Sequence, residues 1–231
     1  MEYKMFAKYY DKFYQKKNYE KEVEFLENIL PTNSRILDVG CGTGVHGELL
    51  EKSGYLVDGL DLNKEMLDIA KNRISGNLYC QNMLNIDINK KYDAIISMFA
   101  VINHLKEVDE LDKVLSNLKK LVFPNGLIII DLHNPQCSGI KTDLFDNVTR
   151  TMCWDYDKDK MIEKTELIFE IDGQIYKDNH IFKIFTIEQI EKSCDKAGLK
   201  LISVYENYQI NKIGTSSSKN LQFLIRNNFK N

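Results

Sequence analysis

Residues 36–44, Ile-Leu-Asp-Val-Gly-Cys-Gly-Thr-Gly, constrain the fold more than any other stretch of the chain. The apolar first half is typical of a buried β-strand. The alternate glycines Gly40, Gly42 and Gly44 indicate a turn before a helix that opens near Val45. Glycine lets the backbone pass close to a ligand because it has no Cβ. In an open α/β sheet, nucleotide-like ligands lie at the carboxyl ends of the strands. The stretch therefore predicts a cofactor-binding turn.

The order of the elements predicts an α/β fold class, with a doubly wound, mostly parallel, seven-stranded Rossmann-like sheet. Strand and helix patterns alternate through the first half of the chain, which is typical of a parallel sheet covered on both faces. The predicted strands are 35–39, 55–60, 77–80, 92–98, 127–132, 199–206 and 220–226. Asn63 and Thr186 are predicted N-caps, Gly198 is predicted to end a helix, and 108–121 is predicted as a helix. Residues 123–126 are predicted as a turn.

We expect one domain over residues 1–231, in four parts. Residues 1–30 form a helical lid, because Phe6, Tyr10, Phe13 and Tyr14 give one helix an aromatic face. The alternative is that this face only docks on the core. Residues 31–134 form the cofactor-binding α/β core, and 186–231 supply the C-terminal helix and strands. Residues 135–185 are rich in Thr, Ile, Phe and Tyr and predict a small antiparallel β excursion.

Composition excludes several classes of function. The chain has 231 residues and a formal net charge of -3, from 31 Lys and Arg against 34 Asp and Glu. Without a basic excess, nucleic acid is not expected as a partner. No apolar run approaches the roughly 18 residues of a membrane span, so no membrane partner is expected. Five scattered cysteines and four histidines without metal-ligand spacing favour free thiols, no metal and a cytoplasmic location. A homodimer remains open.

The glycine turn by itself fits two cofactors. Gly42, Gly44 and Gly47 match a dinucleotide pattern, so a nicotinamide-dependent oxidoreductase is one alternative. Asp38 argues against it, because a carboxylate repels a pyrophosphate and attracts a cation. S-adenosylmethionine carries a sulfonium and an ammonium and no phosphate. Asp61 suits the ribose hydroxyls of either cofactor.

On these residues the chain resembles the class I S-adenosylmethionine-dependent methyltransferases. Residues 36–44 look like their first motif and residues 59–61 like their second. The resemblance implies that Asp61 holds the ribose, that Leu62 and Met66 flank the adenine, and that Asn82 replaces the usual acidic residue at the adenine amino group. The implied cofactor-binding residues are Tyr19, Asp38, Gly40, Cys41, Gly42, Gly44, Asp61, Leu62, Met66, Asn82, Met83 and Met98. The product of the cofactor is S-adenosylhomocysteine.

A second resemblance is to the sugar N-methyltransferases that act on nucleotide-linked aminosugars. It is carried by Tyr10-Asp11-x-x-Tyr14, by Ser97-Met98-Phe99 with His104-Leu105, and by Phe185-Thr186-x-Glu188-Gln189. The residues after the fifth strand, 133–136, depart from the aromatic pattern of that subgroup. The resemblance implies a small-molecule acceptor, and the candidate acceptor-binding residues are Tyr10, His133, Arg150 and Lys219. Trp154 is a further aromatic candidate for packing against the acceptor.

His104 and Tyr14 are the candidate catalytic residues. Methyl transfer is an in-line displacement, so the enzyme must hold the acceptor close to the methyl group. An amine acceptor must also lose a proton, and an imidazole in the loop after the fourth strand is suited to taking it. The alternative is that His104 only caps the helix that follows. An O-methyltransferase acting on a sugar or surface glycan and a non-catalytic cofactor-binding module are the remaining alternatives.

Overall fold

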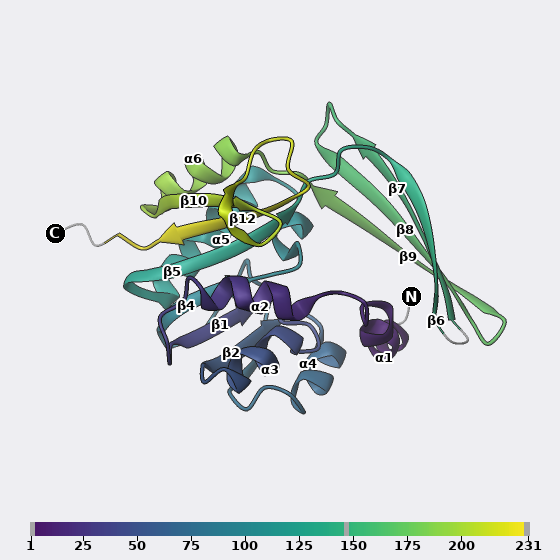
Figure 1. Ribbon diagram of the computed structural model, residues 1–231, viewed down its shortest axis with the longest axis horizontal. Coiled ribbons are helices and arrows are strands. Elements are labelled where there is room, and N and C mark those ends of the chain that lie inside the picture. The colour runs from purple at the N-terminus through teal and green to yellow at the C-terminus, as the bar shows by residue number, and fades with distance from the viewer. Residues whose placement is uncertain (1–2, 146–147, 229–231) are drawn as a thin grey trace.

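The computed structural model describes residues 3–145 and 148–228 (Figure 1). The side chains of residues 3–6 and 8 are not described, so Phe6 of the predicted aromatic face lies outside the described set. The chain folds as an α/β core with a second, antiparallel sheet beside it. This confirms the predicted fold class.

The main sheet has eight strands in the order β11-β10-β12-β5-β4-β1-β2-β3. The strands from β3 to β5 run parallel, and β12 is antiparallel to both of its neighbours. Their bounds are β1 Arg35–Val39, β2 Leu56–Asp61, β3 Leu78–Cys80, β4 Tyr92–Ser97, β5 Val122–His133, β10 Lys200–Glu206, β11 Gln209–Ile213 and β12 Asn220–Arg226. The order reverses between β1 and β4, which is where open α/β sheets bind ligands.

Helices cover both faces of the main sheet (Figure 1). The helices α5 (Val108–Leu121) and α6 (Ile187–Ala197) pack on one face, and α2 (Tyr19–Glu27), α3 (Val45–Lys52) and α4 (Lys64–Ala70) pack on the other. Residues of β5 alternate between the two cores because successive strand residues face opposite sides of a sheet. Ile128 and Ile130 join the α5 core, whereas Ile129 joins the α2 core.

Two local predictions were wrong. The expected turn at 123–126 is an irregular part of β5, where Asn125 has a φ of 64° and its N–H donates to the carbonyl of Asn227. Pairing with the chain beyond β12 therefore extends the strand through the turn residues. The predicted seven strands become eight because β11 folds back on β10 through Asn207 and Tyr208, which have φ values of 52° and 57°. A turn without glycine gave no sequence signal.

The antiparallel excursion is a four-stranded sheet in the order β6-β7-β8-β9. Its strands are β6 (Gly139–Phe145), which the sequence analysis missed, β7 (Val148–Asp157), β8 (Ile162–Ile171) and β9 (Gln174–Lys183). The helix α1 (Tyr3–Phe13) lies between this sheet and the core (Figure 1). The ring of Phe13 stacks on Phe169 at a centroid distance of 4.5 Å. The N-terminal helix is thus anchored by aromatic packing on the second sheet.

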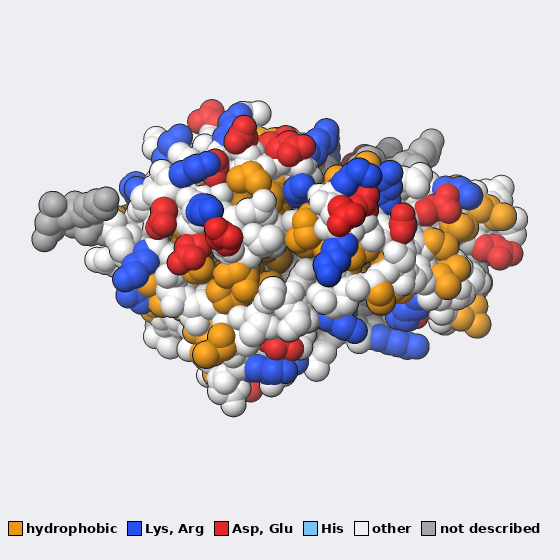
Figure 2. Space-filling model, turned by 90° about the horizontal axis from the view of Figure 1, so that it is seen from above, with side chains coloured by type: hydrophobic (Ala, Val, Ile, Leu, Met, Phe, Trp, Pro, Cys, Tyr) orange, Lys and Arg blue, Asp and Glu red, His pale blue; other side chains and the backbone are white. Residues whose placement is uncertain are grey.

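The face of the molecule in Figure 2 carries charged side chains of both signs. On the face in Figure 2, Lys and Arg side chains intermingle with Asp and Glu, so no extended basic patch forms there. Phosphate backbones bind best to clustered positive charge. Among the described residues, no helix is both long enough and apolar enough to cross a membrane.

Candidate functional site

A cavity of about 810 Å³ lies at the carboxyl ends of β1, β2 and β4. This volume is within the roughly 300–1,000 Å³ of small-molecule sites. Most of the predicted cofactor residues line it: Tyr19, Gly40, Cys41, Gly42, Asp61, Leu62, Met66, Asn82, Met83 and Met98. Tyr10 and His104 also line it. These residues are far apart in sequence, and the ends of adjacent parallel strands bring them together.

The glycine turn follows β1 in a backbone conformation that side chains disfavour. Gly40 has a φ of +78°, and a Cβ built on it would lie 2.5 Å from a methyl group of Val101. Gly42 has a φ of +54°, and a Cβ there would meet nothing within 4 Å. Gly40 is therefore required for packing against the loop after β4. Gly42 leaves its backbone open to the cavity, as a cradle for a ligand requires.

Asp61 connects the end of β2 to the glycine turn. One carboxylate oxygen accepts a hydrogen bond from the N–H of Gly42 at 2.9 Å, and the other accepts from the N–H of Asn63 at 2.8 Å. Burial raises the pKa of Asp61, and the backbone donors oppose that rise. Each carboxylate oxygen can accept a further hydrogen bond. The side chain is therefore suited to ribose hydroxyls that reach into the cavity.

Asp38 lies behind the wall of the cavity, which its neighbours Val39 and Gly40 line. Only 1% of Asp38 is exposed, and its Oδ2 atom has no hydrogen-bond partner among the described residues. Burial raises the pKa of Asp38 to about 6, with His46 opposing the rise and Asp61 adding to it. A buried carboxylate without a partner is unfavourable unless a cation or donor meets it. The buried carboxylate of Asp38 therefore fits a positively charged cofactor.

An ion-paired latch joins α1 to the glycine turn. Asp11 accepts a hydrogen bond from the hydroxyl of Thr43 at 2.7 Å and a second from the guanidinium of Arg73, also at 2.7 Å. Arg73 in turn donates to the carbonyl of Thr43 at 2.9 Å. The sequence analysis missed all three contacts. The latch holds the N-terminal helix over one side of the cavity.

The tyrosines of the predicted lid have different positions. Tyr10 lines the cavity, and burial raises its pKa well above the usual value. Tyr14 packs beside Tyr10 at a centroid distance of 4.7 Å and edge-on to Phe99 at 4.9 Å. Tyr14 does not line the cavity, and the Arg150 guanidinium lies 5.1 Å from its ring. The structure therefore puts Tyr14 behind the lining, where it supports Phe99.

The loop after β4 is strained and is held by a buried carboxylate. Phe99 and Ala100 have φ values of 68° and 59°, in the left-handed region that disfavours side chains. Such residues cost on the order of 1–3 kcal/mol each and persist where the surroundings fix them. Asp131 of β5 accepts from the N–H of Ala100 at 2.6 Å and from the hydroxyl of Tyr208 at 2.5 Å. This clamp positions Phe99, which lines the cavity.

The short 3-10 helix η1 (Val101–His104) carries the candidate base. Asn103 is fully buried and donates to the carbonyls of His133 and Lys183 at 3.2 and 2.8 Å. This side chain ties η1 to the ends of β5 and β9. The ring of His104 packs against Phe182 at 4.8 Å. The surrounding protein, which displaces water from the ring, and the neighbouring His180 lower the pKa of His104 to about 4. The imidazole is therefore neutral at pH 7.

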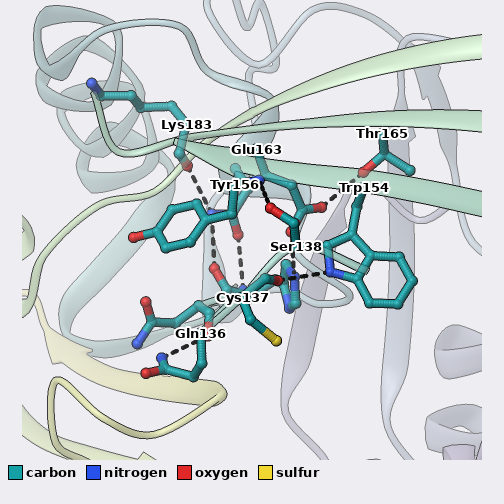
Figure 3. Close-up of polar contacts among 11 residues, drawn as sticks. Gln136, Cys137, Ser138, Trp154, Tyr156, Glu163, Thr165 and Lys183 are labelled. Atoms are coloured by element: carbon teal, nitrogen blue, oxygen red, sulfur yellow. Dashed lines mark hydrogen bonds and ion pairs between the residues drawn. The ribbon is translucent and has the colours of Figure 1, made fainter. Parts of the chain in front are cut away.

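The segment after β5 lies beside Trp154 and Tyr156 of the antiparallel sheet (Figure 3). The indole N–H of Trp154 donates to the carbonyl of Cys137 at 2.9 Å. Glu163 of β8 is 4% exposed, and Thr165 donates to it at 2.8 Å. The other oxygen of Glu163 lies 3.1 Å from Nε2 of His133. The indole of Trp154 is therefore fixed to the segment after β5, and Trp154 does not line the cavity.

Three predicted acceptor-binding residues do not line the cavity: His133, Arg150 and Lys219. Lys219 is exposed on the chain leading into β12. Arg150 is 5% exposed and pairs with Asp143 at 2.6 Å. The Nε and Nη1 atoms of Arg150 have no hydrogen-bond partner among the described residues. Sequence periodicity did not reveal that the side chains of His133 on β5 and Arg150 on β7 lie away from the cavity.

A family model described as a methyltransferase domain matches residues 10–204. The chain is 32% identical over 144 residues to a protein of Geobacillus sp. (strain WCH70) that has a general methyltransferase name. That match spans 58% of either chain, so it covers little more than half of the relative's length. Over 213 residues the chain is 27% identical to dTDP-3-amino-3,6-dideoxy-alpha-D-glucopyranose N,N-dimethyltransferase of Streptomyces fradiae, with 84% of each chain covered.

The fold resembles that of a solved S-adenosylmethionine-dependent methyltransferase from Clostridium acetobutylicum ATCC 824. The TM-score is 0.84 at 24% sequence identity, and the match covers 98% of this chain and 99% of that one. The likeness includes both sheets because nearly the whole chain is aligned. The family match decides against the nicotinamide alternative that the glycine spacing left open.

We expect Asp38→Asn to bind S-adenosylhomocysteine at least tenfold more weakly and to raise the stability of the ligand-free protein. The pKa of Asp38 in the folded protein, about 6, exceeds the reference value of 3.8. Ionised Asp38 therefore lowers the free energy of unfolding by up to about 3 kcal/mol at pH 7. This destabilisation disappears as Asp38 becomes protonated at lower pH. Wild-type affinity should accordingly weaken as pH falls through about 6. Titration calorimetry from pH 5 to 8 and urea unfolding measure both effects.

Asp58→Asn is the matched control. Asp58 is also a buried carboxylate in the main sheet, but Lys90 and Tyr92 donate to it and help to lower its pKa against the effect of burial. Its replacement should destabilise the protein and leave ligand affinity unchanged. Equal affinity of wild type and Asp38→Asn would exclude Asp38 from cation binding.

Proposed function

The chain belongs to the methyltransferase domain family, and we propose that it transfers a methyl group from S-adenosylmethionine to the amino group of a sugar. The cofactor is S-adenosylmethionine, as for the family. The preferred acceptor in this proposal is an aminosugar linked to a nucleotide. Methylation of a sugar hydroxyl is the second candidate, because the same cavity and a neutral His104 suit an alcohol as well.

The observation that carries the proposal is the long match with the Streptomyces fradiae aminosugar N,N-dimethyltransferase. It covers 84% of both chains and therefore extends well beyond the cofactor motifs into the segments that enclose the acceptor. The latch of Asp11 on Thr43 supports the proposal, because a closed lid excludes water from a small acceptor. The aromatic lining from Tyr10 and Phe99 is suited to the apolar face of a sugar.

We assign the cofactor to the cavity at the glycine turn. Gly40 and Gly42 would let the backbone approach it, and Asp61 would accept hydrogen bonds from the ribose hydroxyls. Leu62, Met66 and Asn82 would surround the adenine, with the amide of Asn82 in place of a carboxylate. Asp38 would balance the positive charge from behind the turn. When bound, S-adenosylmethionine supplies an activated methyl group on a positively charged sulfur.

In this proposal, residues of the chain position the acceptor and accept a hydrogen bond from it. In this proposal His104, at the end of η1, accepts a hydrogen bond from the acceptor amine and directs its lone pair into the cavity. The pKa of about 4 keeps the ring unprotonated and ready to accept at pH 7. Phe182 fixes the ring from the side of the antiparallel sheet. The contribution is one of orientation, which the rate of an in-line displacement depends on strongly.

Arg150 is the proposed contact for the phosphates of a nucleotide-linked acceptor. Its guanidinium carries two buried donor atoms without a partner, Nε and Nη1, next to Tyr14. Buried unpaired donors cost on the order of 1–3 kcal/mol, and an anionic ligand would relieve that cost. Reaching Arg150 requires Tyr14 or α1 to move, so acceptor binding would be coupled to the lid.

A screen of acceptors tests the proposed function directly. We expect the protein to methylate a nucleotide-linked aminosugar and not the matching sugar that has a hydroxyl in place of the amine. Each added methyl group raises the mass of the product by about 14 Da. Mass spectrometry of the product with S-adenosylmethionine as donor makes the measurement, and omission of the donor is the control. Methylation of the hydroxyl analogue alone would replace the proposal by O-methylation.

For His104→Ala, we expect turnover to fall about 10²-fold, the size of a proton-accepting or orienting contribution. Affinity for S-adenosylhomocysteine should change less than about threefold, because the glycine turn and Asp61 are untouched. Steady-state kinetics and calorimetry separate the two quantities. Phe182→Leu serves as a comparison, because it loosens the packing of the ring and keeps the imidazole. Full turnover by His104→Ala would remove the residue from the mechanism.

For Arg150→Met, we expect KM for a nucleotide-linked aminosugar to rise by at least tenfold, with KM for the free aminosugar unchanged. The methionine keeps much of the packing of the side chain against Phe13 and Tyr14. Lys141→Met, at an exposed partner of the same Asp143, is the control for lost charge. A uniform rise in KM for both acceptors would mean that Arg150 acts only through the packing of the lid.

A further inference from the structure

Strand β6 lies at one edge of the antiparallel sheet and, among the described residues, has a neighbouring strand on one side only (Figure 1). It pairs with β7 over its full length without a register shift, and its sequence contains no proline. Bulges, proline and short strands protect sheet edges, because an unpaired edge can pair with another chain. The opposite edge, β9, has the polar run Lys-Asp-Asn-His over residues 177–180. The β6 edge is therefore the less protected of the two.

The outer face of this sheet, turned away from α1, is partly apolar. Ile140 and Leu144 of β6 each have 70% of their surface exposed. They lie on one face of the strand, whereas Phe145 on the other face packs against Phe13 of α1. Figure 2 shows hydrophobic side chains at the surface of the end of the molecule that this sheet forms. Exposed apolar surface that is bordered by polar residues is typical of a protein interface.

The sequence of β6 is complementary to itself when two copies run antiparallel. A twofold axis through Thr142, perpendicular to the sheet, places Ile140 opposite the partner's Leu144 and Lys141 opposite the partner's Asp143. Because Thr142 is the middle residue of Gly139–Phe145, the whole strand is then paired. Apolar pairs and opposite charges that face each other across strands stabilise a sheet.

The neighbouring registers are unfavourable. An axis through Lys141 would place two lysines opposite each other, and an axis through Asp143 would do the same with two aspartates. Like charges that lie directly opposite each other destabilise a sheet. Either shift also leaves the end of each strand unpaired. The charges of β6 therefore select the register that is centred on Thr142.

The two charged side chains of β6 are accessible to a second copy. Nζ of Lys141 lies 3.0 Å from Oδ1 of Asp143 in the same chain, and the lysine side chain is 58% exposed. The other oxygen of Asp143, Oδ2, pairs with Arg150 of β7. Oδ1 is thus the oxygen that a lysine of another copy can reach, while Arg150 keeps its own contact.

We propose that two copies of this chain pair along β6 and join their antiparallel sheets into one continuous sheet. Backbone hydrogen bonds between the two edges hold the copies together, as in other cases of strand addition. Ile140 and Leu144 of both copies form one apolar cluster on the outer face, and two Lys141–Asp143 pairs fix the register. A twofold contact of this kind is the commonest arrangement in homo-oligomers. The inference does not rest on the proposed function.

Sedimentation velocity of the full chain tests the dimer. One strand from each copy makes a small interface, so we expect the dimer fraction to rise between about 1 and 100 µM. Hydrogen exchange over residues 139–145 should slow across the same range, because the amides of the free edge become hydrogen-bonded. Leu144→Thr should weaken the dimer about tenfold or more, because it removes apolar contact and keeps a good strand former.

Charge reversal tests the register. Lys141→Glu should stay monomeric over this range, because the introduced carboxylate faces the partner's Asp143. Asp143→Lys should also stay monomeric, because the introduced lysine faces the partner's Lys141. An equimolar mixture of the two variants should form a heterodimer, because each lysine then faces a carboxylate.

Lys164→Glu is the matched control, with the same charge change at an exposed position of β8 inside the sheet. It should leave the dimer unchanged. Circular dichroism verifies that each variant folds, and Lys141→Glu and Leu144→Thr decide the question if Asp143→Lys does not. A wild type that is monomeric at the highest concentration, or a dimer that persists in Lys141→Glu, would overturn the proposal. So would loss of the dimer in Lys164→Glu alone, which would indicate stacking of the outer faces.

Discussion

The contact between Gly40 and Val101 determines the geometry of the whole site. A Cβ at position 40 would lie 2.5 Å from the Val101 side chain, so only glycine lets the turn after β1 and the loop after β4 meet this closely. The loop reaches that position through the strained residues Phe99 and Ala100, held by Asp131. The turn proposed to cradle the cofactor and the loop proposed to face the acceptor are therefore one packed unit.

Local signals predicted the elements of the core well. The expected strand at 35–39 and the expected helix at 108–121 match the structure, as do the caps at Asn63 and Thr186. Each depends on residues within a few positions of one another. The strands β6 and β11 were missed because most of their side chains are exposed, so pairing with the neighbouring strand defines them and no burial pattern marks them. β11 has an exposed side-chain pattern throughout, so pairing with β10 and not burial defines it.

The residues of the candidate site could likewise be predicted only in part. Most of the residues predicted to bind the cofactor come together in the cavity because they follow the ends of parallel strands, and the topology alone gathers such positions. Three of the predicted acceptor residues do not line it, because the direction of their side chains could not be predicted from the sequence. Asp131 had a signal that was overlooked: it is a charged residue in an otherwise apolar strand over 127–132. A carboxylate in that position must have donors, and here they come from Ala100 and Tyr208.

Under the proposed function, two buried charges with unpartnered atoms would connect this architecture to its ligands. Asp38 lies in the core below the cofactor turn, and Arg150 lies in the antiparallel sheet below the lid. Each costs stability in the ligand-free protein, and the two costs are relieved by opposite charges. A cationic cofactor would compensate the first, and an anionic acceptor would compensate the second. Because Tyr14 contacts both Arg150 and Phe99, an acceptor bound by Arg150 would also act on the loop proposed to face the methyl group. In the proposed function, recognition of the far end of the acceptor and alignment of its reacting end would thus be linked through the side chain of Tyr14.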